Sequence, residues 1–320
     1  MRTAKHLLPL IFATALLSAA PRPIDFTANL PAKGTFPAKW IHGSPSLLDN
    51  TDPPVQVHWY NAHTVIMREN KAYNYEGAFM YLYFGNDRAI LLDQGSTSSR
   101  NEWPLRDVVD GVIAQWAKAN GRSPDIELVL AFSHLHGDHF AAINQFIDRP
   151  KTRMMGLTHE EMVAFWGMKN YPADQVEFDL GGRKILVWGN PGHIDSEFAY
   201  YDTYTQILFT GDVFYRGRCY VGNFRMWLAS MKRLVEFAAT HLVAHIVGCH
   251  IEITTKGQDY PRGTTYQPDE PPVQMDVAML KRTYAFAQTI KEPGIYFTGD
   301  VYICNQTRFK TTIDRNPYAY

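Results

Sequence analysis

The sequence predicts an α/β protein in which helices pack on two β-sheets, giving a four-layer αβ/βα sandwich. Two observations support this prediction. Short β-rich runs fill residues 55–93, and from residue 104 onward helical patterns alternate with short apolar runs. The same succession of strands followed by helices then returns in the second half of the chain. Helices laid on two sheets would bury the apolar faces of both kinds of element.

The β-rich runs at the start predict a mostly antiparallel sheet. They cover residues 55–60, 64–68, 78–84 and 89–93, and turn-forming residues such as Gly85-Asn86-Asp87 separate them. A helix should begin at Pro104, because apolar residues then recur at helical spacing up to Trp116. Asn120-Gly121 should end that helix.

The rest of the chain continues the alternation of strands and helices. Predicted strands cover 126–132, 153–157, 176–178, 185–188, 198–201, 207–209, 244–249 and part of 294–303. Predicted helices cover 140–147, 159–166, 224–240 and 273–290. The helix at 224–240 has a long apolar stripe, which we interpret as a core-facing surface.

Length, composition and charge limit the class of protein and the kinds of partner that we expect. The chain has 320 residues, is 46% hydrophobic and carries a formal charge of −1. It can therefore bury a full core, and it has no electrostatic bias toward nucleic acid or anionic membranes. No repeat or flexible interior linker is evident, which favours one folded domain over residues 51–320. We expect a small-molecule partner and no nucleic acid, and the sequence leaves the oligomeric state open.

The first fifty residues differ from the rest. Arg2 and Lys5 precede an apolar run at 7–17 and then Ser18-Ala19-Ala20, the layout of a secretory signal peptide over residues 1–20. The run is short for a stable membrane anchor, although a retained anchor and a buried N-terminal helix are alternatives. We therefore expect an exported protein, periplasmic or secreted. Residues 21–50 form a Pro-rich, extended lead-in, and the three cysteines allow at most one disulfide.

The stretch SHLHGDH, residues 133–139, follows a predicted buried strand. It holds His134, His136, Asp138 and His139, which is more coordinating chemistry than one ion can take from so short a loop. Three further candidates each follow a β-rich run: His193, Asp212 and His250. Any of these three alone is more often a surface or core residue. Together, and with glycines before two of them, they predict one cleft that binds more than one metal ion.

This pattern resembles that of the metallo-β-lactamase-fold superfamily of metallohydrolases. The stretch Leu91-Leu92-Asp93-Gln94-Gly95 is similar to the early strand-turn signature of that family, and the resemblance covers roughly residues 55–255. It implies that residues 51–320 are the catalytic domain and that they hold two Zn²⁺, with iron or manganese possible. The implied first site is His134, His136 and His193. The implied second site is Asp138, His139 and His250, and Asp212 bridges the two.

The resemblance also narrows the reaction. True β-lactamases of this fold generally lack the bridging aspartate, whereas lactonases, thioesterases of the glyoxalase II type and phosphodiesterases have it. The expected enzyme is therefore a metal-dependent hydrolase of a lactone, thioester or other carboxylic ester. A β-lactam or phosphodiester hydrolase is an alternative. A mononuclear iron sulfur dioxygenase shares the His-rich loop and is another. A non-catalytic metal-binding module fits less well, because a structural zinc site needs only four ligands.

Candidate catalytic residues come from the same resemblance, and candidate substrate-binding residues come from the loops near the predicted cleft. A bridging hydroxide would attack, with Asp138 ligating one ion and orienting the nucleophile. Tyr215 resembles the lactonase phenol that polarises the substrate carbonyl, with a packed aromatic as the alternative. Arg216 and Arg218 are candidate clamps for a substrate carboxylate, with solvated surface arginines as the alternative. The long loop at 257–272 is either a functional lid or a structural loop. Its candidates for a substrate-binding wall are Tyr260, Arg262 and Tyr266.

Overall fold

The computed structural model describes residues 21–305, so the expected signal peptide at 1–20 lies outside the described residues. The first sheet has six strands in the order β1-β2-β3-β4-β5-β6. They are β1 (Val55–Asn61), β2 (Thr64–Glu69), β3 (Phe79–Phe84), β4 (Arg88–Leu92), β5 (Glu127–Ala131) and β6 (Thr152–Met154). Strands β1 to β4 are antiparallel, as predicted, while β5 and β6 extend the sheet in parallel with β4.

The second sheet has five strands in the order β12-β10-β9-β8-β7. They are β7 (Gln175–Asp179), β8 (Lys184–Gly189), β9 (Phe198–Asp202), β10 (Ile207–Phe209) and β12 (His245–Val247). Strand β12 runs parallel to β10, and the other neighbouring pairs are antiparallel. A third, smaller sheet joins β11 (Arg218–Tyr220), β14 (Tyr302–Asn305) and β13 (Gly294–Phe297).

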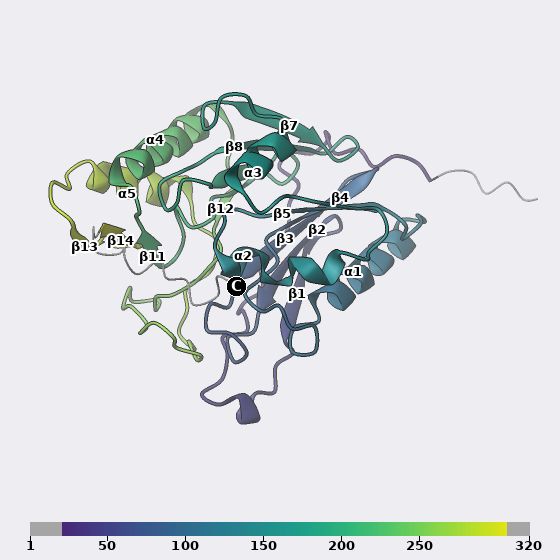
Figure 1. Cartoon of the computed structure of the whole chain (residues 1–320), viewed down its shortest axis with the longest axis horizontal. Coiled ribbons are helices and arrows are strands. Elements are labelled where there is room, and N and C mark those ends of the chain that lie inside the picture. Colours follow the sequence, from purple (N-terminus) through teal and green to yellow (C-terminus); the bar gives the residue numbers. More distant parts are fainter. Residues whose placement is uncertain (1–20, 306–320) are drawn as a thin grey trace, which may run out of the picture.

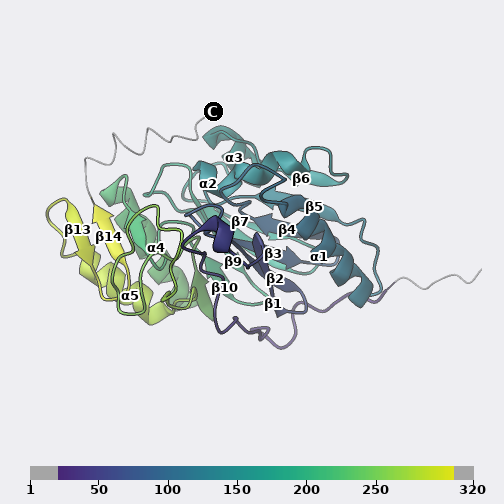
Figure 2. The same cartoon turned by 90° about the horizontal axis from the view of Figure 1, so that it is seen from below.

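Helices cover the outer faces of the two large sheets, which confirms the predicted sandwich. The helical elements are η1 (Leu47–Asp49), α1 (Leu105–Ala119), α2 (Gly137–Phe140), η2 (Ala141–Phe146), α3 (His159–Trp166), α4 (Phe224–Thr240) and α5 (Val277–Ala287). Helix α1 lies outside the first sheet, and α4 and α5 lie outside the second, with the third sheet beyond them (Figures 1 and 2).

The alternation of side chains along the strands of the second sheet explains the layers. On one face, Tyr200 and Phe209 join the core between the two sheets, where the rings of Tyr81 and Phe209 have centroids 4.9 Å apart. On the other face, Trp188 packs with Trp227 of α4 in a second core. Successive strand residues point to opposite faces, so a strand with apolar residues at every position can serve both cores.

Three elements differ from the sequence prediction. The expected helix at 140–147 is one short turn of α2 followed by the 3₁₀ turn η2. The expected helix at 273–290 begins only after Asp276, whose side chain accepts a hydrogen bond from Met279 N and so caps α5. Strand β11 was not predicted, because it is three residues long and pairs with β14, more than eighty residues later in the sequence.

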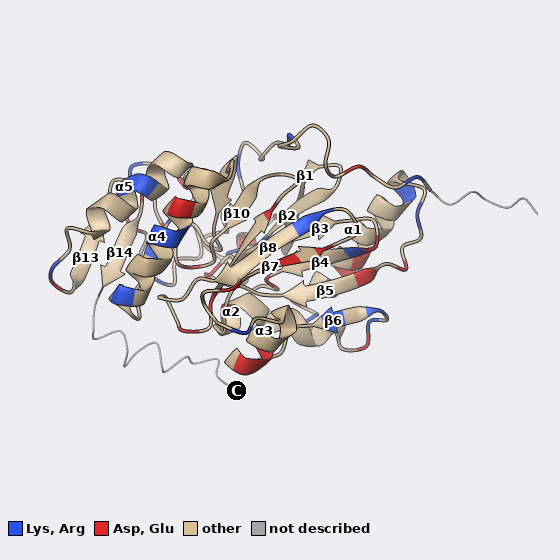
Figure 3. Cartoon of the chain, turned by 90° about the horizontal axis from the view of Figure 1, so that it is seen from above, with Lys and Arg blue, Asp and Glu red and all other residues tan. Residues whose placement is uncertain are grey.

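The lead-in packs against the two sheets. Ala32 N donates to Tyr204 O and Thr35 N to Tyr60 O, and the side chains of Phe26 and Trp40 are buried. All three cysteines are buried free thiols. Acidic and basic residues are interspersed over the helices and loops (Figure 3). Between residues 21 and 305, no helix is both long and apolar enough to cross a bilayer.

Candidate metal centre

All seven predicted ligands gather at one edge of the two sheets, where four strands end. The 134–139 stretch follows β5, His193 follows β8, Asp212 follows β10 and His250 follows β12. Their coordinating atoms fall into overlapping groups whose members lie within 4.8 Å of one another. Rigid sheet ends thus place residues from distant parts of the chain around one centre.

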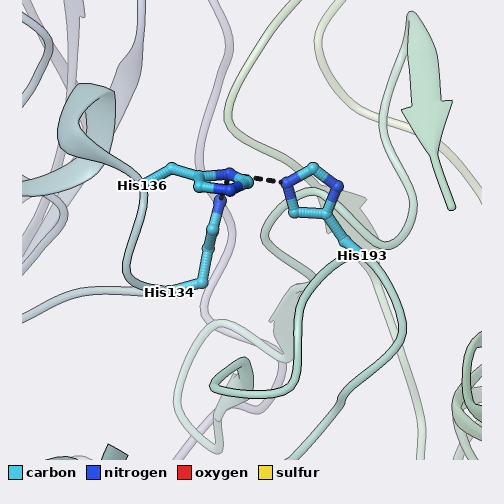
Figure 4. A group of neighbouring side chains, drawn as sticks. All are labelled: His134, His136 and His193. Carbon is cyan, nitrogen blue, oxygen red and sulfur yellow. Dashed lines mark hydrogen bonds between the residues drawn. The ribbon is translucent and has the colours of Figure 1, made fainter. Parts of the chain in front are cut away.

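The first group is His134, His136 and His193 (Figure 4). His136 Nδ1 lies 3.0 Å from His134 Nε2 and 2.9 Å from His193 Nε2. Nitrogen atoms that ligate one tetrahedral zinc ion at about 2.0–2.1 Å lie about 3.3 Å apart. The three imidazoles therefore have the spacing and the convergence that one such ion requires.

The second group is Asp138, His139 and His250. Asp138 Oδ2 lies 3.2 Å from His139 Nε2 and 3.4 Å from His250 Nε2. Both imidazole nitrogens are buried, yet neither has a hydrogen-bond partner within residues 21–305. Buried polar atoms normally have partners, so this pair indicates a position for a bound ion.

Asp212 lies between the two groups. Its Oδ2 is 3.9 Å from His193 Nε2 and 3.7 Å from His139 Nε2, and its Oδ1 is 3.7 Å from His250 Nε2. Oδ1 is also buried and unpartnered among the described residues. One carboxylate with its two oxygens directed at different groups is suited to bridge two ions. The donor set of imidazoles and carboxylates therefore fits two divalent transition metals.

Four of the histidines are oriented through the ring nitrogen that faces away from the centre. His139 Nδ1 lies 2.8 Å from Asp93 Oδ2, and His134 Nδ1 lies 3.0 Å from Ser133 Oγ. The other two histidines contact main-chain carbonyls. His193 Nδ1 lies 2.8 Å from Tyr220 O, and His250 Nδ1 lies 3.1 Å from Glu76 O. Such contacts fix the tautomer that leaves Nε2 free to bind metal.

The two groups differ in electrostatics. Burial lowers the pKa of His134, His136 and His193, that of His136 to about 4, so these imidazoles are neutral at pH 7 and able to bind metal. In the second group burial lowers the pKa of His139 and His250 as well, but nearby carboxylates outweigh it. Asp138 raises the pKa of His139, and Asp212 raises that of His250 to about 9. The same carboxylates would attract a metal cation.

Several functional neighbours were not predicted from the sequence. Glu197, fully buried, accepts a hydrogen bond from Asp212 N at 2.9 Å. Glu76 lies beside Asp138 and His250, and burial together with the charge of Asp138 raises its pKa to about 7. Neither residue stands in a recognisable motif, and both reach the centre only through folding. Asp93, by contrast, could be found in the sequence, because it lies in the Leu91–Gly95 stretch that resembles the strand-turn signature of the family.

The remaining predicted residues lie near the centre in different settings. Tyr215 is buried against the His250 ring at 5.7 Å, and its hydroxyl lies 2.5 Å from one acceptor, Arg218 O, and 2.9 Å from another, Glu252 Oε2. Its catalytic role stays a prediction. The idea that Arg218 clamps a substrate carboxylate is wrong for this structure. Its guanidinium already binds Glu252 and Asp259 at 2.6 Å each, so it ties the start of the long loop to the strand end beyond β12.

The loop at 257–272 is held in place along its length. Arg68 forms two hydrogen bonds to Glu270, and Gln267 N donates to His42 O. Of its substrate-wall candidates, Arg262 hydrogen-bonds Tyr75, next to Glu76. Tyr260 accepts a hydrogen bond from Asp269 N, and Tyr266 packs against His42. Such ties favour a fixed wall over a mobile lid, and substrate contact by these residues stays a prediction.

Comparison with known proteins agrees with this site. The sequence model of the metallo-beta-lactamase superfamily matches residues 74–244. No curated protein gives a significant match.

Solved structures with a similar arrangement include three from different organisms. A metallo-beta-lactamase from Pontibacter korlensis is 16% identical with a TM-score of 0.49, covering 74% of this chain and 100% of that one. A metallo-beta-lactamase from Hirschia baltica is 14% identical with a TM-score of 0.48. The match covers 73% of this chain and 98% of that one. An archaeal superfamily protein from Sulfolobus tokodaii is 15% identical with a TM-score of 0.41, covering 69% and 84%. Because the family model spans more than half of the sequence, the chain belongs to the metallo-beta-lactamase superfamily.

Proposed function

We propose that the protein is a dinuclear zinc hydrolase that cleaves an ester-like bond in a small molecule: a lactone, thioester or carboxylic ester. One observation carries the proposal. The Asp212 carboxylate lies within 4 Å of imidazole nitrogens from both ligand groups, with Oδ2 toward His193 and His139 and Oδ1 toward His250. A mononuclear enzyme has no need of a carboxylate in that position, or of the second set of ligands.

The chain's own residues account for binding and orientation in this mechanism. Bound zinc would supply a nucleophile at neutral pH and polarise the substrate oxygen. Asp138, with one oxygen directed at both His139 and His250, is placed to accept a proton from the attacking water and so to orient it. Neutral His134, His136 and His193 hold the other side of the centre.

The nature of the leaving group favours esters and thioesters. The Tyr215 hydroxyl, our predicted electrophile, has acceptors in Arg218 O and Glu252, so it would have to change partner to reach a substrate. An ester or thioester leaving group needs little protonation, and such a bond is therefore suited to a centre with few available acids. The same reasoning makes β-lactam cleavage a less favoured reaction, because an amine leaving group needs a proton.

We also propose export to the periplasm or beyond. This proposal depends on residues 1–20, and mass spectrometry of the mature N-terminus tests it. If the purified protein begins at residue 1, the leader is not cleaved.

The test of the main proposal combines metal content with a substrate panel. Elemental analysis of purified protein should give two zinc per chain. Hydrolysis of a lactone, a thioester or an aryl ester should proceed, stop after chelation and return with zinc. Turnover restricted to a phosphodiester or a cephalosporin would overturn the ester assignment and keep the dinuclear hydrolase. One iron per chain without hydrolysis of any member would overturn both and favour a sulfur dioxygenase.

A further inference from the structure

Lys71 places a positive charge in the interior close to the second ligand group. It follows strand β2, and only 1% of its surface is exposed. Burial lowers the pKa of its amine to about 8. Lysine is rarely buried, because removing an ammonium group from water is costly unless protein groups replace the lost hydrogen bonds. A fully buried lysine near a metal centre therefore needs a structural reason.

The partners of Lys71 supply that reason. Its Nζ donates to Tyr75 O at 2.7 Å and to Glu76 O at 3.3 Å. No carboxylate in the described part of the chain lies within ion-pair distance of Nζ, so the ammonium is directed at the main chain. Its hydrogen bonds fix the two peptide units that lead from Tyr75 to Gly77.

The carbonyl of Glu76 has a second partner, the metal-ligand candidate His250. His250 Nδ1 lies 3.1 Å from this oxygen, on the side of the ring opposite to Nε2. Ammonium and imidazole therefore converge on one acceptor. Because a carbonyl can only accept, the contact requires a proton on His250 Nδ1, so Nε2, which faces Asp138 and Asp212, is the nitrogen that would bind metal.

The surrounding backbone is shaped around the lysine stem. Gly77 has φ +53°, and a Cβ there would lie 2.4 Å from Lys71 Cγ. Gly43 of the lead-in has φ +82°, and a Cβ there would lie 1.9 Å from Thr265 O and 2.8 Å from Lys71 Cβ. Neither position tolerates a side chain without movement. Arg68 Nε lies 3.4 Å from Gly77 O, so the end of the same short segment is held by a second buried cation.

The first ligand group has no equivalent arrangement among the described residues. His193 Nδ1 contacts Tyr220 O, and His134 Nδ1 contacts the hydroxyl of Ser133, a neighbour in sequence. No lysine is buried beside either of these contacts. A change at Lys71 should therefore act on one half of the metal centre.

We propose that Lys71 is a positioning residue for the second metal site, acting through the Glu76 carbonyl on the orientation and tautomer of His250. The inference depends on the proposed dinuclear centre. It assigns Lys71 no contact with substrate or metal. Residues that orient a metal-ligating histidine in this way typically change metal affinity by about 10–100-fold when they are replaced.

The experiment is a metal titration of the apo-protein that resolves two dissociation constants, with zinc in competition with a chromophoric chelator. Three variants are compared with the unmodified protein. Lys71→Met keeps most of the apolar stem and removes the ammonium. Lys71→Gln keeps a shorter neutral donor. Lys232→Met removes an exposed lysine of α4 that pairs with Glu236, and it serves as the matched control.

The inference predicts a selective effect on the ion held by Asp138, His139 and His250, and hence on one of the two dissociation constants. Lys71→Met should bind one zinc ion as tightly as the unmodified protein does and the other about 10–100-fold more weakly. Lys71→Gln should lose less of this zinc affinity, and Lys232→Met should lose none. A general loss of structure would instead weaken both sites. If Lys71→Met does not fold, circular dichroism will reveal it, and Lys71→Gln then decides.

Two results would overturn the inference, and they are distinguishable. If the unmodified protein binds two zinc ions and the folded Lys71 variants bind both equally tightly, Lys71 has no positioning role and the proposed function stands. If the unmodified protein binds a single ion, the dinuclear proposal itself fails, and the inference fails with it.

Discussion

Two buried polar clusters lie at opposite ends of strands β2, β3 and β9, and they differ in whether the protein alone satisfies them. The Arg183 network, at one end, comprises Arg183, Asp202, Thr64 and Thr205. The metal centre lies at the other end, where Phe198 N at the start of β9 donates to Ser133 O. Both clusters are buried and charged, so burial alone does not identify the functional one.

The Arg183 network is complete. All of the guanidinium nitrogens have acceptors: Asp202 takes two bonds at 2.8 and 2.6 Å, Thr64 Oγ1 takes one, and the carbonyls of His63 and Phe84 take the others. Asp202 also accepts from Thr205 N and Oγ1. No buried side-chain atom of these residues lacks a partner within the described part of the chain.

The metal centre is incomplete in the same sense. His139 Nε2, His250 Nε2 and Asp212 Oδ1 are buried without hydrogen-bond partners in residues 21–305. A stable fold tolerates few such atoms, and three of them directed at one another indicate a partner from outside the chain. The comparison teaches that the unsatisfied cluster is the functional one, and it makes opposite predictions for mutations in the two clusters.

The largest expected effect is on activity, from Asp212→Ala. Without the bridging carboxylate we expect hydrolysis to fall on the order of a thousand-fold or more and metal binding to weaken. The apo-variant should unfold at no lower a temperature than the apo-protein, because the lost carboxylate is buried and incompletely paired. Steady-state kinetics and thermal unfolding measure the two quantities. Asp49→Ala, at an exposed site on η1, is the control, and a marked fall in the melting temperature of apo Asp212→Ala would contradict the comparison.

The opposite result is expected for Asp202→Ala. This change leaves Arg183 as an unpaired charge in the interior, which typically destabilises a protein by about 3–5 kcal/mol. Denaturant unfolding of the apo-protein measures this loss. The matched control is Glu177→Ala, which breaks the exposed pair of Glu177 with Lys184 and should cost less than about 1 kcal/mol. Folded Asp202→Ala protein should still bind two metals, and a selective loss of one ion would show that the two clusters are coupled.

A smaller effect is expected from Asp93→Asn, which alters a residue behind the metal centre. Asp93 has φ +61°, a conformation that asparagine tolerates, so the backbone should keep its shape. The neutral amide is a poorer acceptor for His139 Nδ1 than the carboxylate 2.8 Å away. We expect affinity for the zinc ion held by Asp138, His139 and His250 to fall by about 10–100-fold. The same competition titration measures this change. Equal weakening of both ions would instead point to Ser133, which also binds Asp93 and reaches His134.

The order and type of the main elements could be predicted from the sequence, and so could the convergence of the seven candidate ligands. Strands such as β3 and β5 are continuous apolar runs, and His134 to His139 stand within one loop, so the signals are local. The expected helix start at residue 273 was wrong because Met275 N and O pair with Ile246 of β12. Nothing near residue 275 in the sequence indicates that pairing.

The residues that support the metal centre could not be predicted for the same reason. Lys71 is notable only because it is buried and hydrogen-bonded to the carbonyls of Tyr75 and Glu76, and Glu197 only because it contacts Asp212 N; neither has a motif. Arg218 was one of two candidates for binding a substrate carboxylate, with a solvated surface arginine as the alternative. The structure instead supplies the carboxylates of Glu252 and Asp259 from its own chain. Local patterns therefore identify ligands, whereas their supporting contacts require the fold.

The smallest predicted effect is a loss of folding stability at acidic pH. It arises at the Arg183 network and not at the metal centre. His63 lies beside the network, where its Nδ1 accepts a hydrogen bond from Trp116 Nε1 at 3.1 Å. Burial, with the charges of Arg183 and Arg122, lowers the pKa of His63 to about 4 from an unfolded value near 6.5. Between these values the unfolded chain binds a proton that the folded chain does not, so stability falls as the pH falls from about 6.5 to 4.

This contribution should be on the order of 1 kcal/mol, because partial exposure of the ring screens the full shift. Free energies of unfolding of the apo-protein at pH 7 and pH 4.5 measure it. His63→Gln should lose part of the pH dependence, whereas His241→Gln, at an exposed position, should keep all of it. An unchanged slope in His63→Gln would mean that other titrating groups, and not this histidine beside the complete cluster, set the acid sensitivity of the fold.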